Sequence, residues 1–145
     1  MLKLREAKLE IPQLDRSSYL KGLLITARKD NQLNETEISI IKKLAKRLGF
    51  SSDFFEDTIT NLLENKYITE EPIKFSKPDI AKSFIEDGLK LALADNRVTD
   101  NEINWLKETA KANGIEEELF NKIYKELQSK PHMIGKVEFA LFSLI

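Results

Sequence analysis

Two short turns of the sequence carry acidic residues at the same spacing, and carboxylate oxygens are the ligands that hard cations prefer. In the first turn Asp30 precedes Glu37 by seven positions, and in the second Asp95 precedes Glu102 by the same interval. If the two turns lie side by side, the four carboxylates would form an all-oxygen site for a divalent cation such as calcium, magnesium or manganese. The candidate metal ligands are therefore Asp30, Glu37, Asp95 and Glu102.

Both turns belong to a longer internal repeat, because shifting the sequence by 65 positions aligns them without a gap. The shift places residues 30–38 (DNQLNETEI) on residues 95–103 (DNRVTDNEI). The alignment continues beyond the turns and pairs Gly49 with Gly114 and Phe55 with Phe120. Such a repeat indicates that one supersecondary unit occurs twice. We therefore predict two pseudo-symmetric halves.

The turns match the last eight positions of the twelve-residue calcium loop of an EF-hand, in which an aspartate precedes a left-handed turn and a glutamate closes the site. The first and third loop positions would be Thr26 and Arg28 in one half and Leu91 and Leu93 in the other. None of these four side chains supplies a carboxylate. A calcium-binding EF-hand is therefore excluded, although a different cation site at the turns is not.

A purely structural interpretation accounts for the same acidic residues. Thr99 and Glu102 fit a capping box, in which the hydroxyl and the carboxylate satisfy free amides at the start of a helix. The corresponding residues of the first turn fit the motif nearly as well. Asp30 and Asp95 can accept bonds from amides one or two residues onward, as in Asx-turns. Both interpretations stay open, and the sequence favours the structural one.

The elements that must position these turns are helices, because apolar residues recur at spacings of three and four with few glycines and prolines. The pattern predicts helices over about 17–29, 35–48 and 52–65, and a second set of three that begins near residue 79. Gly49 and Gly114 suit the left-handed residue that ends a helix. We predict an all-α single compact bundle over 1–145: repeat 1 about 17–66, linker 67–78, repeat 2 about 79–130, and a closing helix over 131–145.

Apolar spacing also predicts which side chains face the core. The third helix is expected to bury Phe54 together with Phe55, and its counterpart Leu119 together with Phe120. Trp105 is expected in the core, although it could instead anchor a protein partner.

Composition limits the classes of partner. The 145 residues include 23 basic and 24 acidic side chains, and this balance gives no field that would attract nucleic acid. The final apolar segment is shorter than the roughly twenty residues that span a bilayer, so no membrane insertion is expected. There is no cysteine, and residues 1–10 lack the apolar run of a signal peptide. We expect a cytoplasmic protein.

Residues 24–37 (LITARKDNQLNETE), followed by an amphipathic segment that ends in Leu48-Gly49-Phe50, resemble the TerB-like family of tellurite-resistance proteins. A related domain precedes the J-domain in membrane-bound co-chaperones of the DjlA type. The resemblance covers both halves and implies an all-helical fold with acidic turn residues proposed as a metal site, which by position are the four named above. The glycine usual after the aspartate is asparagine in both copies here.

The leading hypothesis is a non-enzymatic interaction or scaffold module of a bacterial stress-response system, with an unknown protein partner and a divalent cation at the inter-helix turns as an optional part. The alternative is a dedicated divalent metal-ion sensor or buffer. A metal-dependent hydrolase has less support, because His132 is the one histidine and no phosphate loop or nucleophile motif is present.

Overall fold

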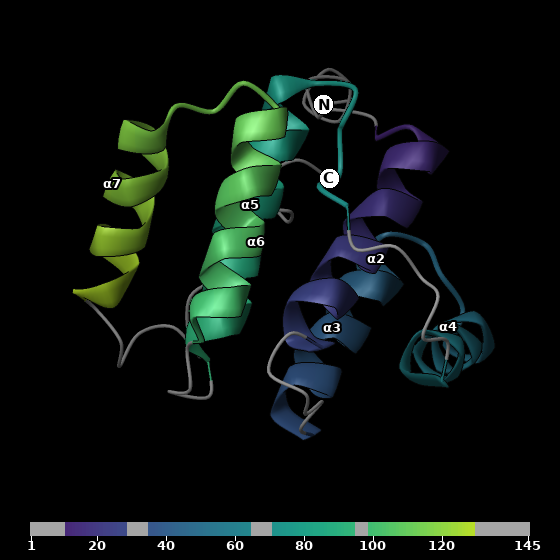
Figure 1. Ribbon diagram of the computed structural model, residues 1–145. Coiled ribbons are helices and arrows are strands. Elements are labelled where there is room, and N and C mark those ends of the chain that lie inside the picture. Colours follow the sequence, from purple (N-terminus) through teal and green to yellow (C-terminus); the bar gives the residue numbers. More distant parts are fainter. Residues whose placement is uncertain (1–10, 29–34, 65–70, 95–98, 130–145) are drawn as a thin grey trace, which may run out of the picture.

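The two longest described helices, α2 (Gln13–Arg28) and α5 (Pro78–Leu93), pack against each other at the centre of the molecule (Figure 1). The computed structural model describes residues 11–28, 35–64, 71–94 and 99–129. Within those ranges all regular elements are α-helices and none is a strand, which confirms the all-α fold class. No helix in these ranges is both long enough and apolar enough to cross a bilayer.

Shorter helices flank this central pair. The helices α3 (Glu35–Arg47) and α4 (Ser52–Glu64) pack against α2, and α6 (Asp100–Ala112) and α7 (Glu117–Gln128) pack against α5. Contacts also join α2 to α6, α3 to α4 and α6 to α7. The outer helices α4 and α7 lie at opposite ends of this arrangement (Figure 1).

An apolar core fills the space between α2 and α5 and takes side chains from the four flanking helices. The ring of Phe84 lies edge-on to Tyr19 and Trp105, with ring centroids 5.4 Å and 6.2 Å away, and lies 5.2 Å from Phe75. Only 3% of Trp105 is exposed, so the prediction that it belongs to the core is confirmed. The apolar side chains along one face of α2 are also buried: Tyr19, Leu20, Leu23, Leu24 and Ala27.

Two glycines end helices in the way that the sequence predicts. Gly49 follows α3 with a φ of 96°, and Gly114 follows α6 with a φ of 76°. The next residues, Phe50 and Ile115, donate their N–H groups to carbonyl oxygens five positions back, at 3.0 Å and 2.9 Å. These bonds form Schellman motifs, which satisfy carbonyl groups at the helix ends and turn the chain toward the next helix.

Replacing Gly114 with alanine is expected to lower the free energy of unfolding by about 1 kcal/mol, because an L-residue resists positive φ. A Cβ atom at this position would meet no heavy atom within 4 Å, so the loss would report the backbone conformation alone. Gly114→Asn is the matched control and should lose less, since asparagine tolerates this conformation. Urea unfolding measures both variants. Equal stability of the alanine variant and the wild type would contradict the expectation.

The non-helical segment 71–77 leads into α5 and is held by side chains distant in sequence. The Asp15 carboxylate of α2 accepts bonds from the backbone N–H of Ser76, at 3.0 Å, and from the Ser76 hydroxyl. Asn113, after α6, donates to the Ile73 carbonyl at 2.7 Å and accepts from the Phe75 N–H at 2.8 Å. The segment therefore ties the start of α2 to the end of α6.

Three sequence predictions about burial and helix bounds are wrong. Phe54 is 48% exposed and Leu119 is 36% exposed, although both were expected inside. Adjacent helical residues point about 100° apart, so Phe55 occupies the core side in the first case and its neighbour points outward. The first helix begins at Gln13, four residues before the predicted start. The proposed closing helix 131–145, with its histidine, lies outside the described residues.

Candidate functional site

Two of the four predicted metal ligands lie in the described part of the chain, and both are buried. Glu37 is the third residue of α3 and Glu102 is the third residue of α6, and each side chain is 1% exposed. Asp30 and Asp95 lie outside the described residues. The convergence of all four carboxylates therefore stays a prediction, whereas the burial of the two glutamates at corresponding helix positions is an observation.

The Glu102 carboxylate takes part in a capping box at the start of α6. Its Oε1 atom accepts bonds from the backbone N–H and from the hydroxyl of Thr99, both at 3.1 Å. In return the Glu102 N–H donates to the Thr99 hydroxyl oxygen at 3.2 Å. The capping box predicted for this turn is thus confirmed. The bonds give Glu102 a structural role that any cation at this turn would have to share.

Replacing Thr99 with alanine is expected to lower the free energy of unfolding by about 1 kcal/mol. The substitution removes the hydroxyl that accepts from the Glu102 N–H and donates to the Glu102 carboxylate, so the cap at the start of α6 is lost. Thr99→Ser keeps the hydroxyl and should retain most of the stability. Thermal unfolding followed by circular dichroism compares the two variants with the wild type. If serine and alanine have the same effect, the loss comes from side-chain packing and not from the cap.

The described ranges contain no group of three or more His, Cys, Asp or Glu side chains that could hold a metal ion. The two buried glutamates would need the aspartates of the turns to complete such a site. No known protein family, curated protein or solved structure matches this chain.

A buried polar cluster links the two central helices and was missed by the sequence analysis. The Tyr19 hydroxyl of α2 lies 2.8 Å from the Ser83 hydroxyl of α5 and donates to the Asp87 carboxylate of α5 at 2.5 Å. Burial, followed by the nearby charge of Asp87, raises the pKa of the Tyr19 hydroxyl well above its ordinary value. All three side chains are buried, so the cluster joins α2 to α5 and does not present a reactive group at the surface.

The described surface is hollowed between α6 and α7 by a groove of about 470 Å³. Its apolar lining comes from Ala110, Ile115 and Phe120. Charged and polar residues also line it: Asn104, Lys107, Glu108, Lys111, Glu116 and Glu117. This volume lies in the range of pockets that take small molecules or single side chains of a partner.

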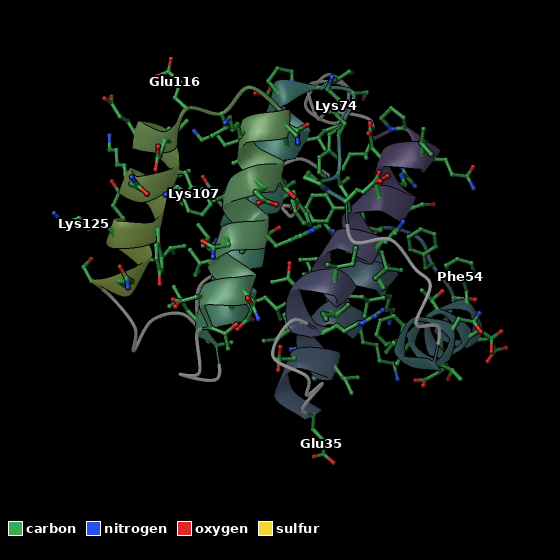
Figure 2. All side chains as sticks on the ribbon, viewed as in Figure 1. Glu35, Phe54, Lys74, Lys107, Glu116 and Lys125 are labelled. Atoms are coloured by element: carbon green, nitrogen blue, oxygen red, sulfur yellow. The ribbon has the colours of Figure 1, made fainter. Side chains whose placement is uncertain are left out.

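An ion pair joins two residues that line the groove, one from each helix. The Lys107 Nζ atom lies 2.6 Å from a carboxylate oxygen of Glu117, and Figure 2 shows Lys107 reaching from α6 toward α7. The hydrogen bond from Lys107, and then its positive charge, lower the pKa of the Glu117 carboxyl. Both side chains are well exposed, so water screens the pair and its contribution to stability is small. The pair instead gives the wall of the groove a defined arrangement of charge.

Proposed function

We propose that this protein is a non-enzymatic helical interaction module whose groove between α6 and α7 receives an apolar side chain of a protein partner. The groove itself carries the proposal, because it combines apolar lining from Ala110, Ile115 and Phe120 with charged residues on both helices. An apolar anchor enclosed by polar contacts is the arrangement in which interface hot spots bind. The charged side chains would orient the partner around that anchor.

The bonding of buried ionisable groups supports an interaction role. Tyr19 and Asp87 bond to each other, Asp15 holds Ser76, and Glu102 caps its own helix. These groups serve contacts within the fold, and they are not gathered in the groove.

The helix bounds support a two-fold repeat. Adding 65 to the bounds of α2 gives 78–93, those of α5, and adding 65 to the bounds of α3 gives 100–112, those of α6. The starts of α4 and α7 differ by the same number. The repeated Schellman glycines and the repeated buried glutamates follow the same interval. We therefore propose two pseudo-symmetric halves. On the resemblance of residues 24–37 we propose in addition that the protein belongs with tellurite-resistance-like proteins of the bacterial stress response and is cytoplasmic.

The groove is tested with a displayed peptide library selected on the wild type. Peptides with an apolar anchor are expected to bind, and Asn104→Trp, which places a large ring at the edge of the groove, should weaken them at least tenfold, or about 1.4 kcal/mol. Lys122→Glu with Lys125→Glu changes the exposed charge of α7 away from the groove lining and is the control. Peptides that bind the tryptophan variant as well as the wild type would refute this function.

A divalent metal-ion sensor or buffer is the second candidate, and the observation that favours it is the burial of Glu37 and Glu102. A carboxylate taken out of water is costly unless bonds or a cation compensate it. Titration with calcium, magnesium, manganese and zinc, followed by amide NMR, separates the candidates. Saturable shifts at both turns that disappear in Asp30→Asn with Asp95→Asn would establish the sensor. Absence of shifts at millimolar metal would leave the interaction module.

A further inference from the structure

The junction between α3 and α4 exposes a stacked pair of aromatic rings. The rings of Phe50 and Phe54 are nearly parallel, at 14°, with centroids 5.0 Å apart. Phe50 is half-buried against the core, whereas Phe54 is 48% exposed and lies at the outer edge of the molecule (Figure 2). The pair therefore presents an aromatic surface that a second molecule could cover.

Backbone bonds on both sides fix the position of this pair. The Schellman motif at Gly49 sets the direction of the chain after α3. The Ser51 hydroxyl oxygen then accepts a bond from the Phe54 N–H at 3.2 Å, and the Ser51 carbonyl accepts from Phe55 at 3.0 Å. Because the junction is ordered by these bonds, covering it would lose little conformational entropy.

The two helices that meet at this junction expose charges of opposite sign. On α3, Lys43 and Lys46 are exposed, and no acidic residue follows Glu37 in that helix. On α4, Asp53 and Asp57 are exposed, and the helix contains no lysine or arginine. Like charges three or four residues apart on a helix repel by a few tenths of a kcal/mol, roughly 0.2–0.5 per pair. An opposite charge on a second molecule would relieve that repulsion.

We propose that this surface is the interface of a two-fold symmetric homodimer. We call it the α3–α4 edge and define it by Lys43, Lys46, Phe50, Asp53, Phe54 and Asp57. In such a dimer the basic α3 of each copy would face the acidic α4 of its partner, so the charged contact would form twice. The aromatic rings of the two copies meet between these charged contacts.

A second copy is the occupant because the edge is complementary to itself. A foreign partner would need an acidic helix, an aromatic contact and a basic helix, and this chain already has all three. The net charge of −1 places no long-range repulsion between copies. Two helices of about 20 Å form a patch smaller than the roughly 800 Å² per partner of a standard interface. The dimer is therefore weak, with a Kd on the order of micromolar, and sensitive to salt.

Sedimentation equilibrium over a range of protein concentrations tests the dimer. The wild type is expected to dimerise, with a Kd that rises about tenfold or more as sodium chloride increases from about 50 mM to about 500 mM. Lys43→Glu with Lys46→Glu should be monomeric, and so should Asp53→Lys with Asp57→Lys. An equimolar mixture of these two variants should form a heterodimer, because each reversed surface then faces a complementary one.

Lys122→Glu with Lys125→Glu is the matched control, since it reverses two exposed lysines of α7 at the same spacing. This control should dimerise like the wild type. Mixed with the Asp53→Lys, Asp57→Lys variant, it should form no heterodimer, although its net charge equals that of the α3 variant. Circular dichroism checks that each variant is folded. A wild type that stays monomeric at all concentrations, or a dimer unaffected by reversal of the edge, would overturn the proposal.

Discussion

Replacing Tyr19 with phenylalanine is expected to lower the free energy of unfolding by about 2–3 kcal/mol. The substitution keeps the ring that packs against Phe84 but removes the hydroxyl that bonds to Ser83 and Asp87. Hydrogen bonds to charged groups contribute about 1.5–3 kcal/mol, and the carboxylate of Asp87 would stay buried with one donor fewer. Urea unfolding of the variant and the wild type measures the loss directly.

Two control variants show whether the hydroxyl acts through this cluster. Tyr124→Phe removes a hydroxyl from a half-buried ring and should change the unfolding free energy by less than about 0.5 kcal/mol. Ser83→Ala should cost about 1 kcal/mol, and the double variant Tyr19→Phe with Ser83→Ala should cost less than the sum of the two. Additive losses would show that the two hydroxyls do not depend on each other.

The same cluster predicts a loss of stability at alkaline pH. Because the pKa of Tyr19 is raised in the folded state, its stabilisation is complete below the unfolded pKa, which is about 10. Above that pH the unfolded chain releases the proton while the folded protein keeps it, so stability falls as pH rises toward the folded pKa. The stability difference between the wild type and Tyr19→Phe should therefore shrink by up to about 1.4 kcal/mol per pH unit above 10. A constant difference between pH 9 and 11, measured by urea unfolding, would contradict this.

Local signals in the sequence predict the helices and their ends because both depend on residues close together in the chain. Apolar spacing identifies the buried face of α2, and Gly49 and Gly114 mark the ends of α3 and α6. The capping box at Thr99 spans four residues and is equally visible. In the candidate site, the local sequence therefore predicts that Glu102 caps the start of α6.

Long-range contacts decide what the sequence could not predict. The hydroxyl of Tyr19 bonds to side chains 64 and 68 positions away, and Asp15 bonds to a residue 61 positions away. Periodicity marks Tyr19 as apolar core without a sign of its polar partners. The groove depends on how far apart α6 and α7 lie. Residue spacing within either helix does not determine that distance. Phe54 was misplaced because a wide apolar stripe does not distinguish neighbouring aromatic residues.

Replacing Gly22 with alanine is expected to lower the free energy of unfolding by about 2–3 kcal/mol, although alanine is the better helix former. In a helix interior the change would by itself stabilise by about 0.5–1 kcal/mol. A Cβ atom here, however, would lie 2.5 Å from Cζ and 2.6 Å from Cε1 of Phe84. The phenylalanine ring cannot retreat easily, because Tyr19, Phe75 and Trp105 surround it. Overpacking of about 1–3 kcal/mol, occasionally more, therefore outweighs the gain in propensity.

A double-variant cycle separates this steric cost from other effects of alanine at residue 22. Phe84→Leu shortens the opposing side chain and is destabilising alone, but it should remove most of the penalty of Gly22→Ala. Lys21→Ala, at an exposed neighbouring position of α2, should stay within about 0.5 kcal/mol of the wild type. If the losses of Gly22→Ala and Phe84→Leu add, close approach of α5 is not the reason for glycine here. If the double variant instead loses less stability than the sum of the two single losses, α2 and α5 pack together through this glycine.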